Sequence, residues 1–166
     1  MSLKVLWWGR FDPGYSRNVV LREAMTSLGC SLSVLRPKCS RFGDIEAMLK
    51  GTETPDVVWV GAFRQRDVAA AVRWARRRGA KVVFDPLISQ YDKSVNEFHK
   101  LKPGSIGARR LLRRESGIFR SADIVVADTV MHRDYYSEVL KVPREKLKVV
   151  YVGKSVESWL EKISAP

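Results

Sequence analysis

Short apolar runs of strand type recur along this 166-residue chain, and each is followed by a helical stretch. The runs are Leu3–Trp8, Leu32–Leu35, Val57–Val60, Val82–Phe84, Ile124–Ala127 and Lys148–Val152. Buried parallel strands read as continuous Val, Ile, Leu and aromatic runs, and the helices that connect them cover both faces of the sheet. The sequence therefore predicts one doubly wound α/β domain over residues 1–166, with a mostly parallel six-stranded sheet.

Apolar residues at helical spacing predict the connecting helices. The first has Ser16 as its predicted N-cap and Gly29 just past its end, and its expected buried face is Val20, Leu21, Ala24, Met25 and Leu28. Gly79 is the predicted stop of the second helix. The predicted helices are Arg17–Leu28, Arg66–Arg78, Ser105–Ala122, Thr129–Leu140 and Ser155–Ile163.

The charge balance indicates an anionic partner. Thirty Lys and Arg against eighteen Asp and Glu give a net charge of +12, which attracts phosphates, nucleic acid or anionic lipid surfaces. No RRM or KH signature accompanies this charge, so nucleic acid is not the favoured partner. The absence of a long apolar run and of a leader pattern leads us to expect a soluble, cytoplasmic protein. Cys30 and Cys39 form no zinc or disulfide pattern, so we expect no metal site.

The turn after the first strand has features of a phosphate site. Gly9 and Gly14 let the backbone approach a bound group, Arg10 and Arg17 add charge, and Tyr15 leads into the helix N-terminus. The alternative is a βα turn that uses glycine only for a tight bend. Neither G-x-G-x-x-G nor G-x-x-x-x-G-K-[ST] occurs, so no NAD or P-loop nucleotide is expected as a cofactor.

Two aspartates end neighbouring strands of the predicted sheet. Asp85 follows the fourth strand and Asp128 follows the fifth, so both open onto the edge that carries the glycine turn. Such carboxylates orient sugar hydroxyls, act as a base or hold a metal, or they simply cap turns and helix starts. The long segment after Asp85 contains Tyr91 and Asp92 and exceeds the usual connection length, which is typical of functional loops.

The predicted helix Ser105–Ala122 has an apolar arc, an arginine-rich arc and one inward carboxylate. Glu115 lies near the middle of the apolar arc, and a buried carboxylate is costly unless it is paired or accepts hydrogen bonds. We therefore expect a defined partner, either a structural ion pair or loop clamp, or a ligand. His132, early in the next helix, is interpreted as a lone surface histidine.

Several of these segments carry a resemblance to a known enzyme family. The runs Lys4–Arg10, Pro55–Val60 and Val83–Asp85 resemble the N-terminal half of a GT-B glycosyltransferase. The strongest similarity is in Glu115–Thr129 followed by Val142–Gly153, which is similar to the family-four retaining glycosyltransferases, also called group 1. The resemblance spans nearly the whole chain.

This resemblance implies a Rossmann-like acceptor domain, facing a second domain that holds most of the nucleotide-sugar donor. A glycan or lipid-linked acceptor would bind in the cleft between them. By the same likeness, Gly9 and Gly14 border the donor phosphates, while Glu115 and Asp128 support the cleft. The residues that would face the acceptor are Arg64, Asp85, Tyr91 and Asp92. Many relatives carry a histidine at the end of the fourth strand, and this chain does not. The catalytic residue stays open, with Asp85 and Asp92 as the candidates.

The family's second domain carries two glutamates with seven residues between them (E-x7-E), and no glutamate pair here has that spacing. We therefore expect an N-terminal domain that is inactive alone, with a separate chain supplying the other half as the alternative. The arginine arc of Ser105–Ala122 could lie on an anionic membrane at its inner face, or it is simply a solvated helix face. The rival function is a non-catalytic, flavodoxin-like module that binds a phosphate-containing ligand or nucleic acid.

Overall fold

All six strands form one parallel sheet. In the computed structural model, which describes residues 2–151 and 153, the strand order is β2-β1-β3-β4-β5-β6. Each neighbouring pair is parallel. The strands are β1 (Lys4–Trp8), β2 (Ser31–Leu35), β3 (Val57–Val60), β4 (Lys81–Phe84), β5 (Ile124–Ala127) and β6 (Leu147–Val149). The predicted doubly wound α/β fold is confirmed; the bounds of β3 and β5 are as predicted, and those of the other strands differ by at most three residues.

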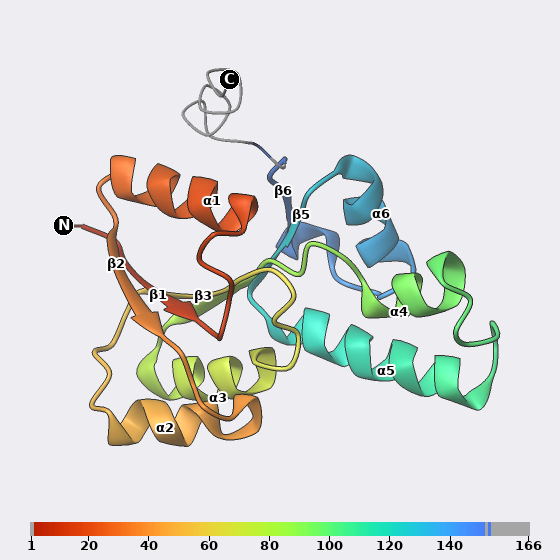
Figure 1. The fold of residues 1–166 in the computed structure, drawn as a ribbon, viewed down its shortest axis with the longest axis horizontal. Helices are drawn as coiled ribbons and strands as arrows, with labels where there is room; N and C mark the ends of the chain where they lie inside the picture. The colour runs from red at the N-terminus through yellow and green to blue at the C-terminus, as the bar shows by residue number, and fades with distance from the viewer. Residues whose placement is uncertain (1, 152, 154–166) are drawn as a thin grey trace, which may run out of the picture.

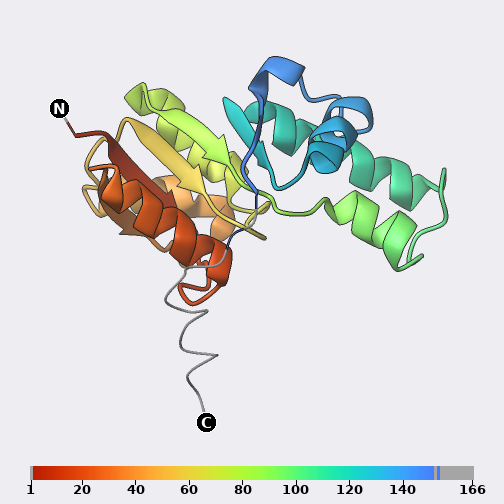
Figure 2. The ribbon, with the colours of Figure 1, turned by 90° about the horizontal axis from the view of Figure 1, so that it is seen from above.

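Within the described residues, six α-helices connect the strands (Figure 1). They are α1 (Ser16–Ser27), α2 (Gly43–Leu49), α3 (Val68–Arg78), α4 (Gln90–Asp92), α5 (Ile106–Ser121) and α6 (Val130–Glu138). Figure 2 shows α4 and the N-terminal part of α5 extending beyond the sheet at one end of the molecule. No helix within the described residues is both long and apolar enough to cross a bilayer.

Each face of the sheet has its own apolar core. On one face, side chains of alternate strand positions pack with α2, α3, α5 and α6 around Trp8, Trp74, Phe84 and Phe119. On the other face, Trp7 and Trp59 stack with ring centroids 5.6 Å apart and α1 packs over them. These four tryptophans therefore belong to the buried cores of the sheet.

The first helix differs from its prediction. Its N-cap is Tyr15, with Ser16 as the first helical residue, and its two buried side chains are Arg17 and Asn18. Leu28 is 82% exposed, so the predicted apolar face is only partly buried. This part of the prediction was wrong because the helix buries an ion pair at its start, which a count of apolar residues does not detect.

Other helix boundaries follow local signals. Gly79 ends α3 with a φ of 70°, the left-handed C-cap that its position predicted. The Ser105 hydroxyl accepts from Ala108 N at 3.2 Å and caps α5. Helix α2 was not predicted, and the long segment after β4 contains α4 followed by a single π-helical turn, Lys93–Glu97. The predicted helix Ser155–Ile163 lies outside the described residues.

Candidate functional site

The carboxyl ends of the strands gather the predicted site residues at one edge of the sheet. Backbone bonds continue the pairing past the strands, because Gly9 N donates to Leu35 O and Asp85 N to Val60 O, each at 2.9 Å. Asp128 directly follows β5 at the same edge. The glycine turn and both aspartates are thus on the same side of the sheet, as parallel strands require.

The turn after β1 lies where the strand order reverses, the point at which parallel α/β sheets open a crevice. Gly9 has a φ of 119°, and a Cβ there would lie 3.1 Å from Asp67 Oδ2, so glycine is required for both reasons. Arg64 Nε donates to the same oxygen at 2.6 Å. The rings of Tyr15 and Phe63 meet edge-on with centroids 5.4 Å apart. The β1 and β3 turns therefore contact each other directly.

The loop before α1 uses some of its backbone donors internally. Gly14 N donates to the Asp12 carboxylate at 2.9 Å, and Arg10 is exposed. The N-cap Tyr15 supplies no side-chain hydrogen bond to the first turn. Uncapped N–H groups at a helix start favour a bound anion. The phosphate site predicted for this turn therefore remains a prediction, centred on the helix start.

Arg17 and Asp85 form a buried ion pair that joins α1 to β4. Arg17 Nε donates to both oxygens of Asp85, at 2.8 and 3.0 Å, and the two residues are 2% and 0% exposed. Arg17 Nη1 donates to Val150 O at 3.0 Å, while Nη2 has no hydrogen-bond partner among the described residues. Burial raises the pKa of Asp85 and the Arg17 charge opposes that shift. The Asp85 carboxylate is thus sealed from solvent, which a proton-transfer role would not allow in this conformation.

Asp128 pairs with a histidine that the sequence analysis set aside. The His132 ring nitrogen Nδ1 contacts Asp128 Oδ1, and the His132 ring stacks on Tyr136 with centroids 6.0 Å apart. His132 is therefore held by two neighbours, and its interpretation as a lone surface residue was wrong. The helix cap is Thr129, whose hydroxyl accepts from His132 N at 3.1 Å. The Asp128 carboxylate is left to orient the imidazole.

Glu115 clamps the segment that follows β4. Its carboxylate accepts from Ser89 Oγ at 2.9 Å, Gln90 N at 2.6 Å and Tyr91 N at 2.7 Å. The expected defined partner of this buried residue is therefore the first turn of α4. Burial raises the pKa of Glu115, while the three donated hydrogen bonds oppose the shift. The clamp fixes the backbone of Tyr91 and Asp92, two residues predicted to face an acceptor.

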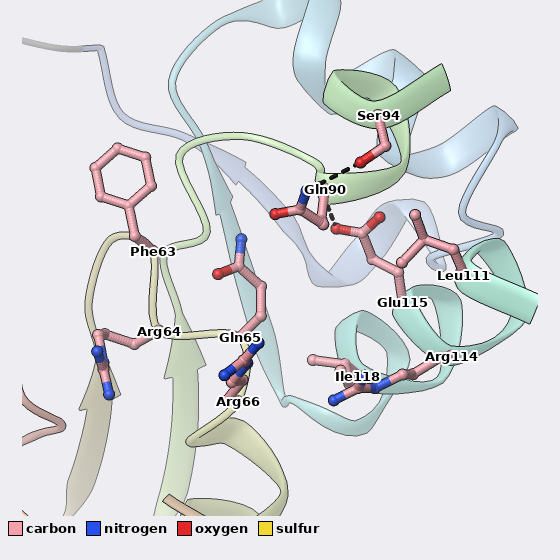
Figure 3. Close-up of a pocket in the computed structure, with 10 residues that line it drawn as sticks. All are labelled: Phe63, Arg64, Gln65, Arg66, Gln90, Ser94, Leu111, Arg114, Glu115 and Ile118. Atoms are coloured by element: carbon pink, nitrogen blue, oxygen red, sulfur yellow. Dashed lines mark hydrogen bonds between the residues drawn. The ribbon is translucent and has the colours of Figure 1, made fainter. Parts of the chain in front are cut away.

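A pocket of about 460 Å³ lies between the β3–α3 loop, α4 and α5 (Figure 3). We call it the arginine pocket, and its lining includes Phe63, Arg64, Arg66, Gln90, Arg114 and Ile118. Two bulky residues near it have left-handed backbone, Phe63 with a φ of 62° and Leu87 with a φ of 64°. Backbone strain of this kind clusters at functional sites. Of the predicted site residues, the structure brings Arg64 and Glu115 to this pocket.

The remaining candidates lie close to the pocket but outside its lining. Tyr91 and Asp92 are half-buried at the start of α4, and Asp92 Oδ1 accepts from Asn96 at 2.7 Å. Asp67, which contacts Arg64, was missed by sequence reasoning, as was the role of Asn18. Asn18 Nδ2 donates to the Asp12 carbonyl at 2.8 Å. The one available signal was that both polar residues occur at the beginning of a helix directly after a strand turn.

Residues 13–153 match the model of the glycosyl transferase 4-like domain. The chain belongs to this family. The match includes the start of α1, the α4 segment, the Glu115 clamp and the Asp128–His132 pair.

A solved structure supports the same fold for this glycosyl transferase 4-like domain. The structure of Anabaena HepE in complex with UDP aligns with a TM-score of 0.57 at 14% sequence identity. The alignment covers 93% of this chain and 45% of that chain, so this chain spans less than half the length of HepE. No curated protein matches the chain significantly. The Rossmann-like fold of one half of a GT-B enzyme is therefore shown.

Proposed function

We propose that this domain is the acceptor-side half of a retaining glycosyltransferase that needs no metal ion. The enzyme transfers a sugar from a nucleotide-sugar donor to a glycan or lipid-linked acceptor. The observation that carries the proposal is the glycosyl transferase 4-like match over residues 13–153 on half of a GT-B fold. The UDP named for HepE supports a nucleotide-sugar as donor.

The sheet edge supplies a place for each partner. The uncapped start of α1, with Gly9 and Gly14 in the preceding turn and Arg10 beside it, borders the donor phosphates. The acceptor lies against Arg64, Tyr91 and Asp92. Asp85 acts as a positioning residue, because its carboxylate is enclosed by Arg17, and Asp92 is left as the catalytic candidate.

The surface charge supports a proposal for the cellular setting. The exposed arginines Arg109, Arg110 and Arg113 on α5 lie against anionic lipid at the inner face of the membrane, where a cytoplasmic enzyme meets lipid-linked acceptors. This setting fits a role in polysaccharide biosynthesis. The net charge of +12 supports it by favouring an anionic surface.

A donor panel tests the proposal. The reading frame that encodes this chain is expressed with any donor-binding domain encoded within or beside it, and release of nucleoside diphosphate is measured over a panel of nucleotide-sugars and acceptors. We expect turnover with one donor, and about a hundredfold loss of kcat for Asp92→Asn. If the second domain is folded and no donor of the panel supports turnover, the transferase proposal is contradicted. A wild-type kcat for Asp92→Asn would show that Asp92 is not a catalytic residue.

A further inference from the structure

The arginine pocket carries more positive charge than the protein itself neutralises. Three arginines line it, Arg64, Arg66 and Arg114, against the single carboxylate of Glu115. Arg64 is paired with Asp67. Within the described residues, Arg66 and Arg114 meet no carboxylate at ion-pair distance, and both are exposed. The pocket thus holds two guanidinium groups with free donors.

The Glu115 carboxylate does not face these guanidinium groups. Both of its oxygens accept hydrogen bonds from the α4 side, one from Gln90 N and the other from Ser89 and Tyr91. Its partners are therefore backbone and hydroxyl donors. A guest in the pocket meets arginine donors that no protein acceptor has taken.

The two free arginines come from different elements. Arg66 precedes α3 in the loop after β3, and Arg114 is on α5; Figure 3 shows both side chains extending into the lower part of the pocket. Like charges that line one pocket repel each other, and an anion bound between them removes that repulsion. Guanidinium groups offer paired N–H donors that match the oxygens of phosphate and carboxylate. Arginine pairs of this kind are therefore suited to one shared anion.

The rest of the lining suits a sugar attached to such an anion. Phe63, Leu111 and Ile118 form an apolar wall, and the amide of Gln90 lies at the rim, where it donates to Ser94 Oγ at 3.0 Å. Apolar surface with a few placed polar groups is typical of small-molecule sites. The strained backbone of Phe63 fixes the wall beside the arginines.

We propose that the arginine pocket binds a negatively charged group of the acceptor, a phosphate, diphosphate or carboxylate attached to a sugar, between Arg66 and Arg114. That the bound molecule receives the transferred sugar rests on the proposed function; that the pocket binds an anion does not. The charged group belongs either to a soluble acidic sugar or to a lipid diphosphate.

Pyrophosphate binding tests the anion site directly. The purified chain is titrated with pyrophosphate at constant ionic strength by calorimetry, with methyl glucoside as the neutral probe. We expect Arg66→Gln and Arg114→Gln each to weaken pyrophosphate about tenfold. Arg76→Gln, an exposed arginine on α3 outside the pocket, is the matched control and should change affinity by less than about twofold. Equal losses in all three variants, or none, overturn the proposal.

Two further arms identify the source of the anion and separate this inference from the proposed function. Glucose 1-phosphate represents the soluble acidic sugar, and a short-chain polyprenyl diphosphate sugar represents the lipid diphosphate. The ligand that binds more tightly to the wild type, and whose affinity falls in Arg114→Gln, identifies the source of the anion. In the transfer assay, Arg114→Gln should raise KM for the charged acceptor about tenfold, with little change for the donor. An unchanged acceptor KM overturns the acceptor assignment. Absent turnover would contradict the transferase, while the pyrophosphate titration still decides whether the pocket binds anions.

Discussion

At the scale of single residues, the buried Arg17–Asp85 pair has the largest expected effect on stability. Both side chains are almost fully enclosed, and each removes the need for the other to be solvated. A buried charge that loses its partner costs far more than an apolar pair of the same volume. The pair is therefore compatible with a stable fold only when both members are present.

The change Asp85→Asn should lower the free energy of unfolding by about 3–5 kcal/mol, because it leaves the Arg17 guanidinium buried without a counter-charge. Urea unfolding followed by circular dichroism measures this loss. The double change Arg17→Met with Asp85→Leu should recover most of it. A single variant with the wild-type midpoint would show that solvent reaches the pair.

The carboxyl of Glu115 should give folding a specific pH dependence. Its pKa is raised by burial above the ordinary value of 4.5, so the folded state binds the proton more tightly than the unfolded state. Its contribution to stability is present below pH 4.5 and is lost as the pH rises through the folded pKa. The free energy of unfolding of the wild type, minus that of Glu115→Gln, should therefore fall as the pH is raised from 4.5 toward neutrality.

Urea unfolding at a series of pH values measures that slope. Glu23→Gln, at an exposed position on α1, is the matched substitution. A slope for Glu23→Gln as large as that for Glu115→Gln would contradict burial as the cause.

The sequence indicated which side chains are important more often than it indicated which residues they contact. Glu115 stood out because a carboxylate inside an apolar helix arc is costly without a partner, and Asp85 because it ends a strand at the edge where ligands bind. Their partners were not readable, because the α4 backbone and Arg17 come from distant parts of the chain. His132 was misread for a different reason: Asp128 is only four positions away, but their contact depends on the first turn of α6, which begins after the Thr129 cap.

At the scale of elements, caps position functional side chains. The Thr129 hydroxyl starts α6 and thereby places His132 over Asp128. Thr129→Ala should lower the free energy of unfolding by about 1 kcal/mol, whereas Thr129→Ser, which keeps the hydroxyl, should stay within a few tenths. Urea unfolding compares the two. Equal losses would mean that the Thr129 methyl, rather than the cap, stabilises this turn.

Strongly patterned elements were predictable and short ones were not. Helix α5 was located to within a residue because its apolar and arginine arcs persist over sixteen residues between Ser105 and Ala122. Helix α2 has only seven residues and keeps Ile45 and Met48 half-exposed, so its apolar pattern is weak. The α4 turn depends on Glu115, a contact made 24 to 26 positions away in the sequence.

At the scale of the whole molecule, the net charge of +12 should produce binding to anionic vesicles that weakens with salt. Cosedimentation with vesicles of anionic and of neutral lipid measures it. Replacing Arg109, Arg110 and Arg113 on α5 by Gln should weaken binding at least about tenfold. Replacing Arg76, Arg77 and Arg78 on α3 removes the same charge elsewhere. Equal losses would assign the effect to net charge rather than to α5.

The overall architecture was the most predictable level. Six apolar runs and their connecting helices determined the parallel sheet, and parallel pairing placed the functional turns at one edge. The arginine pocket was not predictable, because its walls come from the β3–α3 loop and α5, which meet only through packing.

The partners of the Arg17 guanidinium are synthesised long after Arg17 itself. Arg17 bonds to Asp85, 68 positions later, and to the carbonyl of Val150, 133 positions later. Contacts between such distant segments form late, because the intervening chain must first be ordered. Helix α1 therefore leaves the ribosome long before Asp85 and Val150 do. Until residue 85 emerges, the nascent protein carries an unpaired cation where its finished form has an interior, and until residue 150 emerges that cation lacks its carbonyl acceptor.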